Sequence, residues 1–399
     1  MKTFDEALDY LLSKAIPTAK TEQVPIHQAL GRTLAQDITS TLNVPPHHNS
    51  MMDGYAVRST EVVAAKDFAV SQRIAAGSVG EPLMVSTVAR IFTGAPMPEG
   101  ADAVVMQEEA VEKEGVVTFS VESVTKKQNV RHIGEDIAVG DVILAKGHKL
   151  RPQDLGLITS IGLGKVSVYK PLVIATFTTG DELVEPGEKA DAGKIYNANR
   201  YVLAGLVPQL GFELIDLGRV PDCLDATIDV LEQAATVADV VITTGGVSVG
   251  DEDHIKPAVD SIGHLDMWKV KMKPGKPIAF GEVAGKPFIG LPGNPVSAFA
   301  TFNLFARPFL LAMQGQHHCM IEPIWLKAGF DWTKVGFRRD FVRARLENRE
   351  QETRVTLYPN QGSGVLTSTV WADGLAVIPE DTMIAKGDLV AYYPFNDMR

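Results

Sequence analysis

The residues best suited to chemistry in this chain lie in three short motifs rich in glycine, carboxylate and lysine. They read TTGGVSVGDED at 243–253, WKVKMKPGKP at 268–277 and GLPGNPVSAF at 290–299. In the first motif, which includes Gly245, Gly246 and Ser248, the glycines let backbone N–H groups converge on an anion because no Cβ obstructs the approach. Acidic and basic groups together after a strand suit a magnesium ion beside a phosphate. An ordinary glycine turn with a solvated charged loop is the alternative, but three such motifs so close together favour a ligand site.

Lysines alternate with apolar residues in the second motif. Lys269, Lys271 and Lys273 are two positions apart, so one extended strand would place their ammonium groups on the same face. Lys276 follows in a Pro-Gly-Lys-Pro turn. Lysines also protect the edge strands of sheets against aggregation, which is the alternative. The neighbouring carboxylate loop favours an anion site.

Carboxylates occur in separated groups, each at or before an expected helix. They are Asp181 with Glu182, then Asp222, then Asp251 to Asp253. Several of them at one crevice could hold hydrated magnesium through one or two carboxylates. Helix capping explains Asp222 nearly as well.

The third motif predicts a helix start that could bind an anion. Asn294 is a good N-cap residue and the following proline a good first helical residue, with Pro292 just ahead. Free N–H groups there could bind an anion, although plain capping is an equally good interpretation. In the C-terminal part, patterning alone favours a solvated surface for Arg343 and for the turn QGSG at 361–364.

Alternating strands and helices are expected to position these residues. Apolar strands at 172–177, 212–217 and 239–242 alternate with helices near 197–210 and 222–237. This pattern indicates an α/β domain with a parallel sheet covered on both faces. Two of the strands end in a TTG turn, and ligands of such sheets bind at the carboxyl ends of strands, so both turns should face one crevice.

The remaining segments predict three further domains in an α/β multidomain chain. The first helix has a capping box formed by Thr3 and Glu6. The expected domains are a linking domain of residues 1–44 plus 140–170, an inserted β-rich lobe of 45–139, the α/β domain of 171–313, and a C-terminal β-sandwich or barrel of 314–399.

Composition limits the class of protein. The 399 residues carry a net charge of −11, which argues against a general nucleic-acid binder. The two cysteines, Cys223 and Cys319, form no CxxC pair, which fits a reducing cytoplasm and argues against a zinc site. We expect no signal peptide. We also expect no apolar stretch that reaches the roughly 18 residues needed to cross a membrane.

Taken together, these segments resemble the molybdopterin molybdenumtransferase family of the MoeA type, bacterial relatives of the E domain of gephyrin. The resemblance extends over nearly the whole chain. Besides the three motifs above, it rests on NSMMDGYAVR at 49–58, FTGAPMPEGADAVVMQE at 92–108, GED at 134–136, TTGDEL at 178–183 and QGSG at 361–364.

The resemblance implies a transferase of molybdenum cofactor biosynthesis. Such an enzyme inserts molybdate into adenylylated molybdopterin, hydrolyses the adenylyl group and releases AMP, with magnesium or a similar divalent ion assisting. The resemblance makes Glu182, Asp222 and Asp253 the expected ligands of that ion. By motif, the family's functional positions fall on Asp53, Thr93, Asp136, Glu182, Asp222, Asp253, Lys269, Lys273, Arg343 and Ser363. The family also implies a homodimer with composite sites between subunits, and contact with the molybdopterin adenylyltransferase that supplies the substrate.

Two other classes of function remain open at this point. One is a nucleotide or pyrophosphate hydrolase that uses the same α/β domain. The other is a non-catalytic scaffold, against which the intact set of carboxylates and lysines argues.

Overall fold

The computed structural model describes residues 1–247, 254–349 and 352–398, which form two compact units. Unit 1 contains Met1–Glu22, Gly31–Ala35 and Val168–Arg399. Unit 2 contains Gln23–Leu30 and Gln36–Ser167. Each unit has its own sheets and core, so each is described by itself.

A six-stranded sheet forms the centre of unit 1. In spatial order its strands are β16 (Glu213–Val220), β13 (Val173–Thr179), β17 (Val240–Thr244), β21 (Lys286–Leu291), β20 (Pro277–Val283) and β18 (Gly263–Lys269). The first four are parallel, as the alternating pattern predicts, and β20 and β18 run antiparallel to their neighbours. The strands β13 and β17 are adjacent, so their two TTG turns leave the sheet at the same edge.

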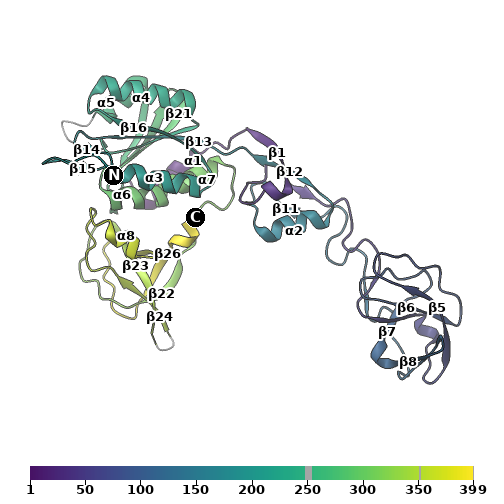
Figure 1. Cartoon of the computed structure of the whole chain (residues 1–399). Coiled ribbons are helices and arrows are strands. Elements are labelled where there is room, and N and C mark those ends of the chain that lie inside the picture. Colours follow the sequence, from purple (N-terminus) through teal and green to yellow (C-terminus); the bar gives the residue numbers. More distant parts are fainter. Residues whose placement is uncertain (248–253, 350–351, 399) are drawn as a thin grey trace. The chain divides into compact units, whose positions relative to one another are not determined.

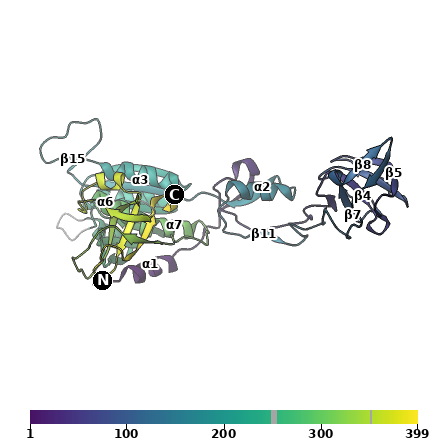
Figure 2. The same ribbon diagram turned by 90° about the horizontal axis from the view of Figure 1, so that it is seen from below.

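Helices cover both faces of this sheet (Figure 1). One face carries α4 (Leu224–Val237) and α5 (Ile255–Ile262), which pack on Ala175, Phe177 and Val241. The other face carries a second set of helices, which are labelled in Figure 2. They are α1 (Phe4–Ser13), α3 (Ala198–Gln209) and one continuous helix made of α6 (Pro295–Thr301), η4 (Phe302–Ala306) and α7 (Arg307–Met313).

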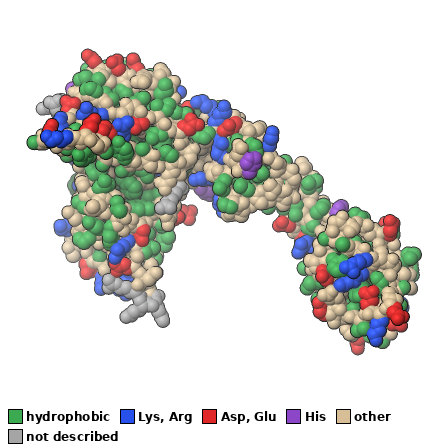
Figure 3. Space-filling model, viewed as in Figure 1, with side chains coloured by type: hydrophobic (Ala, Val, Ile, Leu, Met, Phe, Trp, Pro, Cys, Tyr) green, Lys and Arg blue, Asp and Glu red, His purple; other side chains and the backbone are tan. Residues whose placement is uncertain are grey.

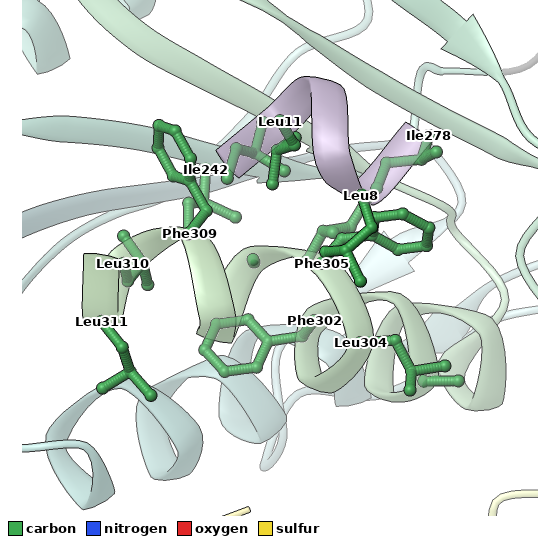
Figure 4. Packing of buried hydrophobic residues seen from close by; sticks show 14 of the residues in the cluster. Leu8, Leu11, Ile242, Ile278, Phe302, Leu304, Phe305, Phe309, Leu310 and Leu311 are labelled. Carbon is green, nitrogen blue, oxygen red and sulfur yellow. The ribbon is translucent and has the colours of Figure 1, made fainter. Parts of the chain in front are cut away.

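The helix Pro295–Met313 is the centre of the larger hydrophobic core (Figure 4). Its Phe305 and Phe309 contact Phe4 of α1 and Phe280 of β20, with ring centroids 5.0 and 5.3 Å apart. By length and composition alone this helix could cross a membrane, contrary to the expectation that no such stretch exists. It is 89% buried in the protein, which is the behaviour of a core helix.

The first helix belongs to unit 1 rather than to a linking domain. The predicted capping box is present, because the Glu6 amide donates to Thr3 Oγ1 and the Thr3 amide to Glu6 Oε2. Its apolar face, including Leu8 and Leu11, is buried in the core shared with the sheet. The prediction groups this helix with the linking domain of residues 1–44 plus 140–170, whereas its packing lies in unit 1; helical periodicity shows that a face is buried but not against what.

The C-terminal part of unit 1 is a small β-barrel. Five strands close into a ring, because β23 pairs with both β24 and β25. In ring order they are β23 (Arg339–Arg349), β24 (Glu352–Leu357), β22 (Ile324–Ala328), β26 (Leu389–Pro394) and β25 (Gly374–Ile378). The short strand β19 (Met272–Lys273) joins this sheet, and α8 (Thr367–Trp371) follows β24.

The lysine-rich segment is therefore not one strand. The strand β18 ends at Lys269 in the central sheet, whereas β19 pairs with the barrel strand β23. The predicted alternation survives locally, because Val270 and Met272 are fully buried and the lysines between and after them are more exposed. The periodicity identified the buried side chains but could not show that the chain passes from one sheet to another.

Unit 2 contains a six-stranded β-rich lobe and a small helical part. In spatial order the lobe strands are β7 (Ala103–Met106), β4 (Gly54–Val57), β6 (Thr87–Ile91), β5 (Asp67–Ile74), β9 (Val116–Phe119) and β8 (Ala110–Lys113). The strands β8 and β9 form a hairpin whose turn residues, Glu114 and Gly115, both have positive φ. The remaining elements are β1 (Thr21–Pro25), β2 (Ile38–Thr39), β3 (Asn49–Ser50), β10 (Val130–Arg131), β11 (Val142–Leu144), α2 (Pro152–Ser160) and β12 (Lys165–Tyr169).

Candidate active site

A cavity of about 520 Å³ lies at the carboxyl ends of β13 and β17 in unit 1. Two of its walls are the TTG turns that follow these strands, as the sequence predicts. The predicted site residues that line it are Glu182, Asp222, Gly245, Gly246, Pro292 and Asn294. Residues from three of the sequence motifs thus meet at one place.

The glycine pair brings the backbone close to the end of β13. Gly245 and Gly246 have φ values of +89° and +61°, which residues with a Cβ adopt only with strain. A Cβ on Gly245 would lie 2.7 Å from the carbonyl oxygen of Thr179, and one on Gly246 2.9 Å from the Thr179 hydroxyl. Both glycines are therefore required to keep this part of the cavity open.

The carboxylates lie close together along one side of the cavity. Burial raises the pKa of Asp222, and the negative charges of Asp181 and Glu182 raise it further. The Asp222 amide donates to Asp181 Oδ1 at 3.3 Å. The Glu182 carboxylate lies back over Gly180, where a Cβ would be 2.6 Å from Glu182 Oε2. This concentration of negative charge suits a cation.

A further wall of the cavity comes from the short parallel strands β14 (Leu183–Val184) and β15 (Ile195–Tyr196). Acidic and basic side chains lie side by side over the loop that connects them (Figure 3). One of these pairs is Lys189 with Asp191, whose charged atoms are 3.2 Å apart.

The helix start at Asn294 contacts the barrel. The Val296 amide donates to the carbonyl oxygen of Ser363 at 3.0 Å, so this N–H is not free for an anion. The Asn294 side chain makes no cap hydrogen bond, and the backbone carbonyl of Asn294 accepts from the Ala298 amide at 2.9 Å. The QGSG turn therefore packs against the helix that borders the cavity, which patterning alone did not predict.

Arg343 is buried, so the expected solvated surface is wrong for this residue. It is 1% exposed, and burial lowers the pKa of its guanidinium to about 10. Its Nε donates to Ser368 Oγ at 3.0 Å and its Nη2 to the carbonyl oxygen of Gly362 at 3.2 Å. These contacts hold the QGSG turn in place beside α8.

Lys273 lies at a second cavity of about 620 Å³, bordered also by Gln361 and Gly362. Its Nζ is 3.5 Å from Asp340 Oδ2, and burial raises the pKa of Asp340 in spite of this lysine. Lys269 ends β18 opposite Pro277, a residue of the first cavity, and the Lys276 carbonyl accepts from the Val270 amide. The three lysines are thus distributed along one segment rather than gathered on one face.

In unit 2 the structure brings together two of the three predicted residues. The Thr93 amide and hydroxyl donate to Asp53 Oδ1 at 2.8 and 2.7 Å. These two bonds, with the charge of Arg90, lower the pKa of Asp53. Asp136 is exposed on the loop after β10, where its amide donates to the Val44 carbonyl.

Two predicted residues, Ser248 and Asp253, lie outside the described residues. Within residues 1–247, 254–349 and 352–398, no three His, Cys, Asp or Glu side chains are grouped to hold a metal ion. The predicted set of Glu182, Asp222 and Asp253 therefore stays a prediction.

Three polar residues at the cavity were missed from the sequence. Thr179, Asn197 and Asn199 line it, and Asn197 caps α3 by accepting from the Arg200 amide. The sequence YNAN at 196–199 carried a signal, because an asparagine before an apolar helix is a common N-cap.

Comparison with known proteins agrees with this architecture. Three family descriptions match in order: MoeA N-terminal region (domain I and II) over residues 2–162, probable molybdopterin binding domain over 175–312, and MoeA C-terminal region (domain IV) over 326–395. A molybdopterin molybdenumtransferase of Haemophilus influenzae is 38% identical over the full length of both chains. One from Staphylococcus aureus is 33% identical and covers 89% of this chain and 86% of its own.

The fold is also that of a solved relative. The crystal structure of a molybdopterin biosynthesis moeA protein from Pyrococcus horikoshii OT3 matches with a TM-score of 0.86 and 31% identity, over 99% of this chain and all of that one. The multidomain α/β architecture with β-rich domains is thereby confirmed. The chain belongs to the molybdopterin molybdenumtransferase family.

Proposed function

We propose that this protein acts in molybdenum cofactor biosynthesis by inserting molybdate into adenylylated molybdopterin, with hydrolysis of the adenylyl group and release of AMP. The observation that supports the proposal best is the cavity at the ends of β13 and β17, where a glycine pair faces a group of carboxylates. The family and the names of its members supply the substrate class.

The residues of the chain supply charge and position rather than a nucleophile. Molybdate and the diphosphate of the substrate are anions, which cationic side chains such as Lys273 and Lys269 would bind. Cleavage at phosphorus depends mostly on positioning and neutralisation of charge, so these lysines would stabilise the reacting state. Gly245 and Gly246 leave room for the substrate next to the end of β13.

Magnesium fits the carboxylate side of the cavity. Burial and then the negative charges of Asp181 and Glu182 raise the pKa of Asp222, and a divalent cation would favour its ionised form by offsetting both effects. Magnesium is commonly held by only one or two carboxylates with water as the other ligands, so Glu182 and Asp222 would suffice, with Asp253 as the predicted third. When bound, the ion would neutralise phosphate charge.

The test is reconstitution with purified protein, adenylylated molybdopterin, molybdate and magnesium, in which AMP and molybdenum-bound pterin are measured together. We expect equal amounts of both products and little AMP without molybdate. AMP release that does not depend on molybdate would instead indicate a nucleotide or pyrophosphate hydrolase. Absence of both products would favour a scaffold.

We further propose that the active form is a homodimer in which Asp53, Thr93 and Asp136 of one subunit complete the site of the other. The Asp53→Ala and Lys273→Gln homodimers should each be nearly inactive. A mixed dimer has one site with both defects and one with neither, and random exchange makes half of the dimers mixed, so roughly a quarter of wild-type activity should return. No recovery after proven subunit exchange would contradict the composite site.

Two further proposals follow from the family. The molybdopterin adenylyltransferase that makes the substrate would contact this protein, and both would work in the cytoplasm. Co-purification of the two proteins tests the contact.

A further inference from the structure

Two buried polar atoms at the 520 Å³ cavity have no hydrogen-bond partner in the protein. They are the hydroxyl oxygen of Thr179, a residue only 4% exposed, and the amide oxygen of Asn199. In the described part of the chain just two other buried side-chain nitrogen or oxygen atoms lack a partner, on Arg58 and Glu109 of unit 2. Burying a polar atom unpaired is costly, so such atoms at a cavity indicate hydrogen bonds made with water or with a ligand.

The orientation of the Asn199 amide is fixed by its other end. Its Nδ2 donates to the carbonyl oxygen of Gly293 at 2.7 Å. Reversing the amide would place an oxygen against that carbonyl, so the unpaired atom at the cavity is the oxygen, which only accepts hydrogen bonds.

Thr179 differs from an equally buried threonine on the neighbouring strand. Thr243 is 0% exposed, and its hydroxyl donates to the Phe177 carbonyl at 3.1 Å. The Thr179 hydroxyl lies beside Gly246, where a Cβ would approach it to 2.9 Å. The absence of a Cβ on Gly246 thus leaves space beside this buried hydroxyl at the wall of the cavity.

We propose that Thr179 and Asn199 are specificity-determining residues that hydrogen-bond the uncharged part of the substrate. Asn199 Oδ1 needs an N–H or O–H donor. Molybdate and the substrate's diphosphate present acceptor oxygens, so the Asn199 amide oxygen does not bind them; it accepts from a ring N–H, an amino group or a sugar hydroxyl. The identity of the ligand rests on the function proposed above.

Two parts of adenylylated molybdopterin carry such donors, and separate probes distinguish them. AMP carries ribose hydroxyls and an adenine amino group, whereas 6-hydroxymethylpterin carries the pterin amino group and ring N–H. Titration calorimetry with each probe should show which one loses affinity in Thr179→Val and Asn199→Leu. We expect a loss of roughly 3- to 10-fold for that probe, as for one neutral hydrogen bond.

Stability of the ligand-free protein provides a readout that a structural role would not give. Thr179→Val removes an unpaired hydroxyl at nearly constant shape, so its melting temperature should stay level or rise. The matched control Thr243→Val removes a bonded hydroxyl and should lower the melting temperature. Thr179→Ser keeps the hydroxyl and should retain most of the affinity. In turnover measurements, Thr179→Val should raise KM more than it lowers kcat.

A Thr179→Val protein that melts as low as Thr243→Val and binds both probes like wild type would overturn the proposal. If the wild type binds neither probe, the ligand assignment is wrong whatever the melting result. Binding that depends on Thr179 without molybdenum insertion would contradict the proposed function alone and leave the hydrogen-bonding role standing.

Discussion

Replacing Gly246 with alanine should close the cavity at the end of β13. The residue has φ +61°, and a left-handed backbone costs a residue with a Cβ about 1–2 kcal/mol. The new methyl would also lie 2.7 Å from Ile255 Cγ1 and 2.9 Å from Thr179 Oγ1. Overpacking of this kind costs about 1–3 kcal/mol, so the variant should lose roughly 2–5 kcal/mol in all.

The assay compares thermal unfolding with turnover of adenylylated molybdopterin. At about 2–4 °C per kcal/mol for a unit of this size, Gly246→Ala should lower the melting temperature of unit 1 by roughly 4–20 °C. It should also abolish most activity below that temperature, because the methyl occupies the space beside Thr179. Gly205→Ala in α3 is the matched control, since nothing lies within 4 Å of its new methyl, and it should stabilise the protein by about 0.5–1 kcal/mol. A Gly246→Ala protein as stable and active as Gly205→Ala would show that Gly246 is not needed to keep the cavity open.

Three further variants test other parts of the account. Lys273→Gln should reduce kcat by about 10²–10³. The melting temperature should change little, because Lys273 Nζ is 3.5 Å from Asp340 Oδ2 and the lysine is half exposed. Lys113→Gln on the lobe is the control, and wild-type turnover of Lys273→Gln at saturating substrate would contradict the role of Lys273. Arg343→Ala should lower the free energy of unfolding by about 2–4 kcal/mol and raise KM, because the Gly362 carbonyl loses its hydrogen-bond donor and the QGSG turn is no longer held in place. An unchanged KM would show that the QGSG turn does not affect substrate binding in the cavity. Arg151 holds the pKa of the buried Asp154 well below its ordinary 3.8, with His148 contributing, so the stability that Asp154 provides is present above about pH 4 and is lost as the pH falls below it. Hydrogen exchange of α2 should therefore distinguish wild type from Asp154→Asn at pH 7 and less so near pH 3; a difference that does not depend on pH would point to packing instead.

The sequence predicted those parts of the site that depend on local patterns. A buried strand followed by a glycine turn occurs at both β13 and β17, and a parallel sheet brings such turns together, so the cavity followed from the pattern. The capping box at Thr3 was also a local pattern and was confirmed.

What the sequence could not show depends on packing between distant segments. Arg343 occupies a position that the alternating pattern of its strand assigns to the surface, yet α8 and the QGSG turn cover its side chain. The neighbouring residues in the sequence do not indicate that this side chain is covered. The break between β18 and β19 is likewise decided by which sheet offers a partner strand. Asn199 and Thr179 are ordinary polar residues in sequence, and only their unpaired burial at the cavity distinguishes them.

The most direct test of the central claim is a crystal structure of the protein with adenylylated molybdopterin bound. We expect the substrate in the 520 Å³ cavity, with its uncharged part within hydrogen-bonding distance of Thr179 Oγ1 and Asn199 Oδ1. Substrate bound elsewhere, for example in the separate cavity of about 510 Å³ lined by His48, Met97 and Lys127 in unit 2, would contradict it.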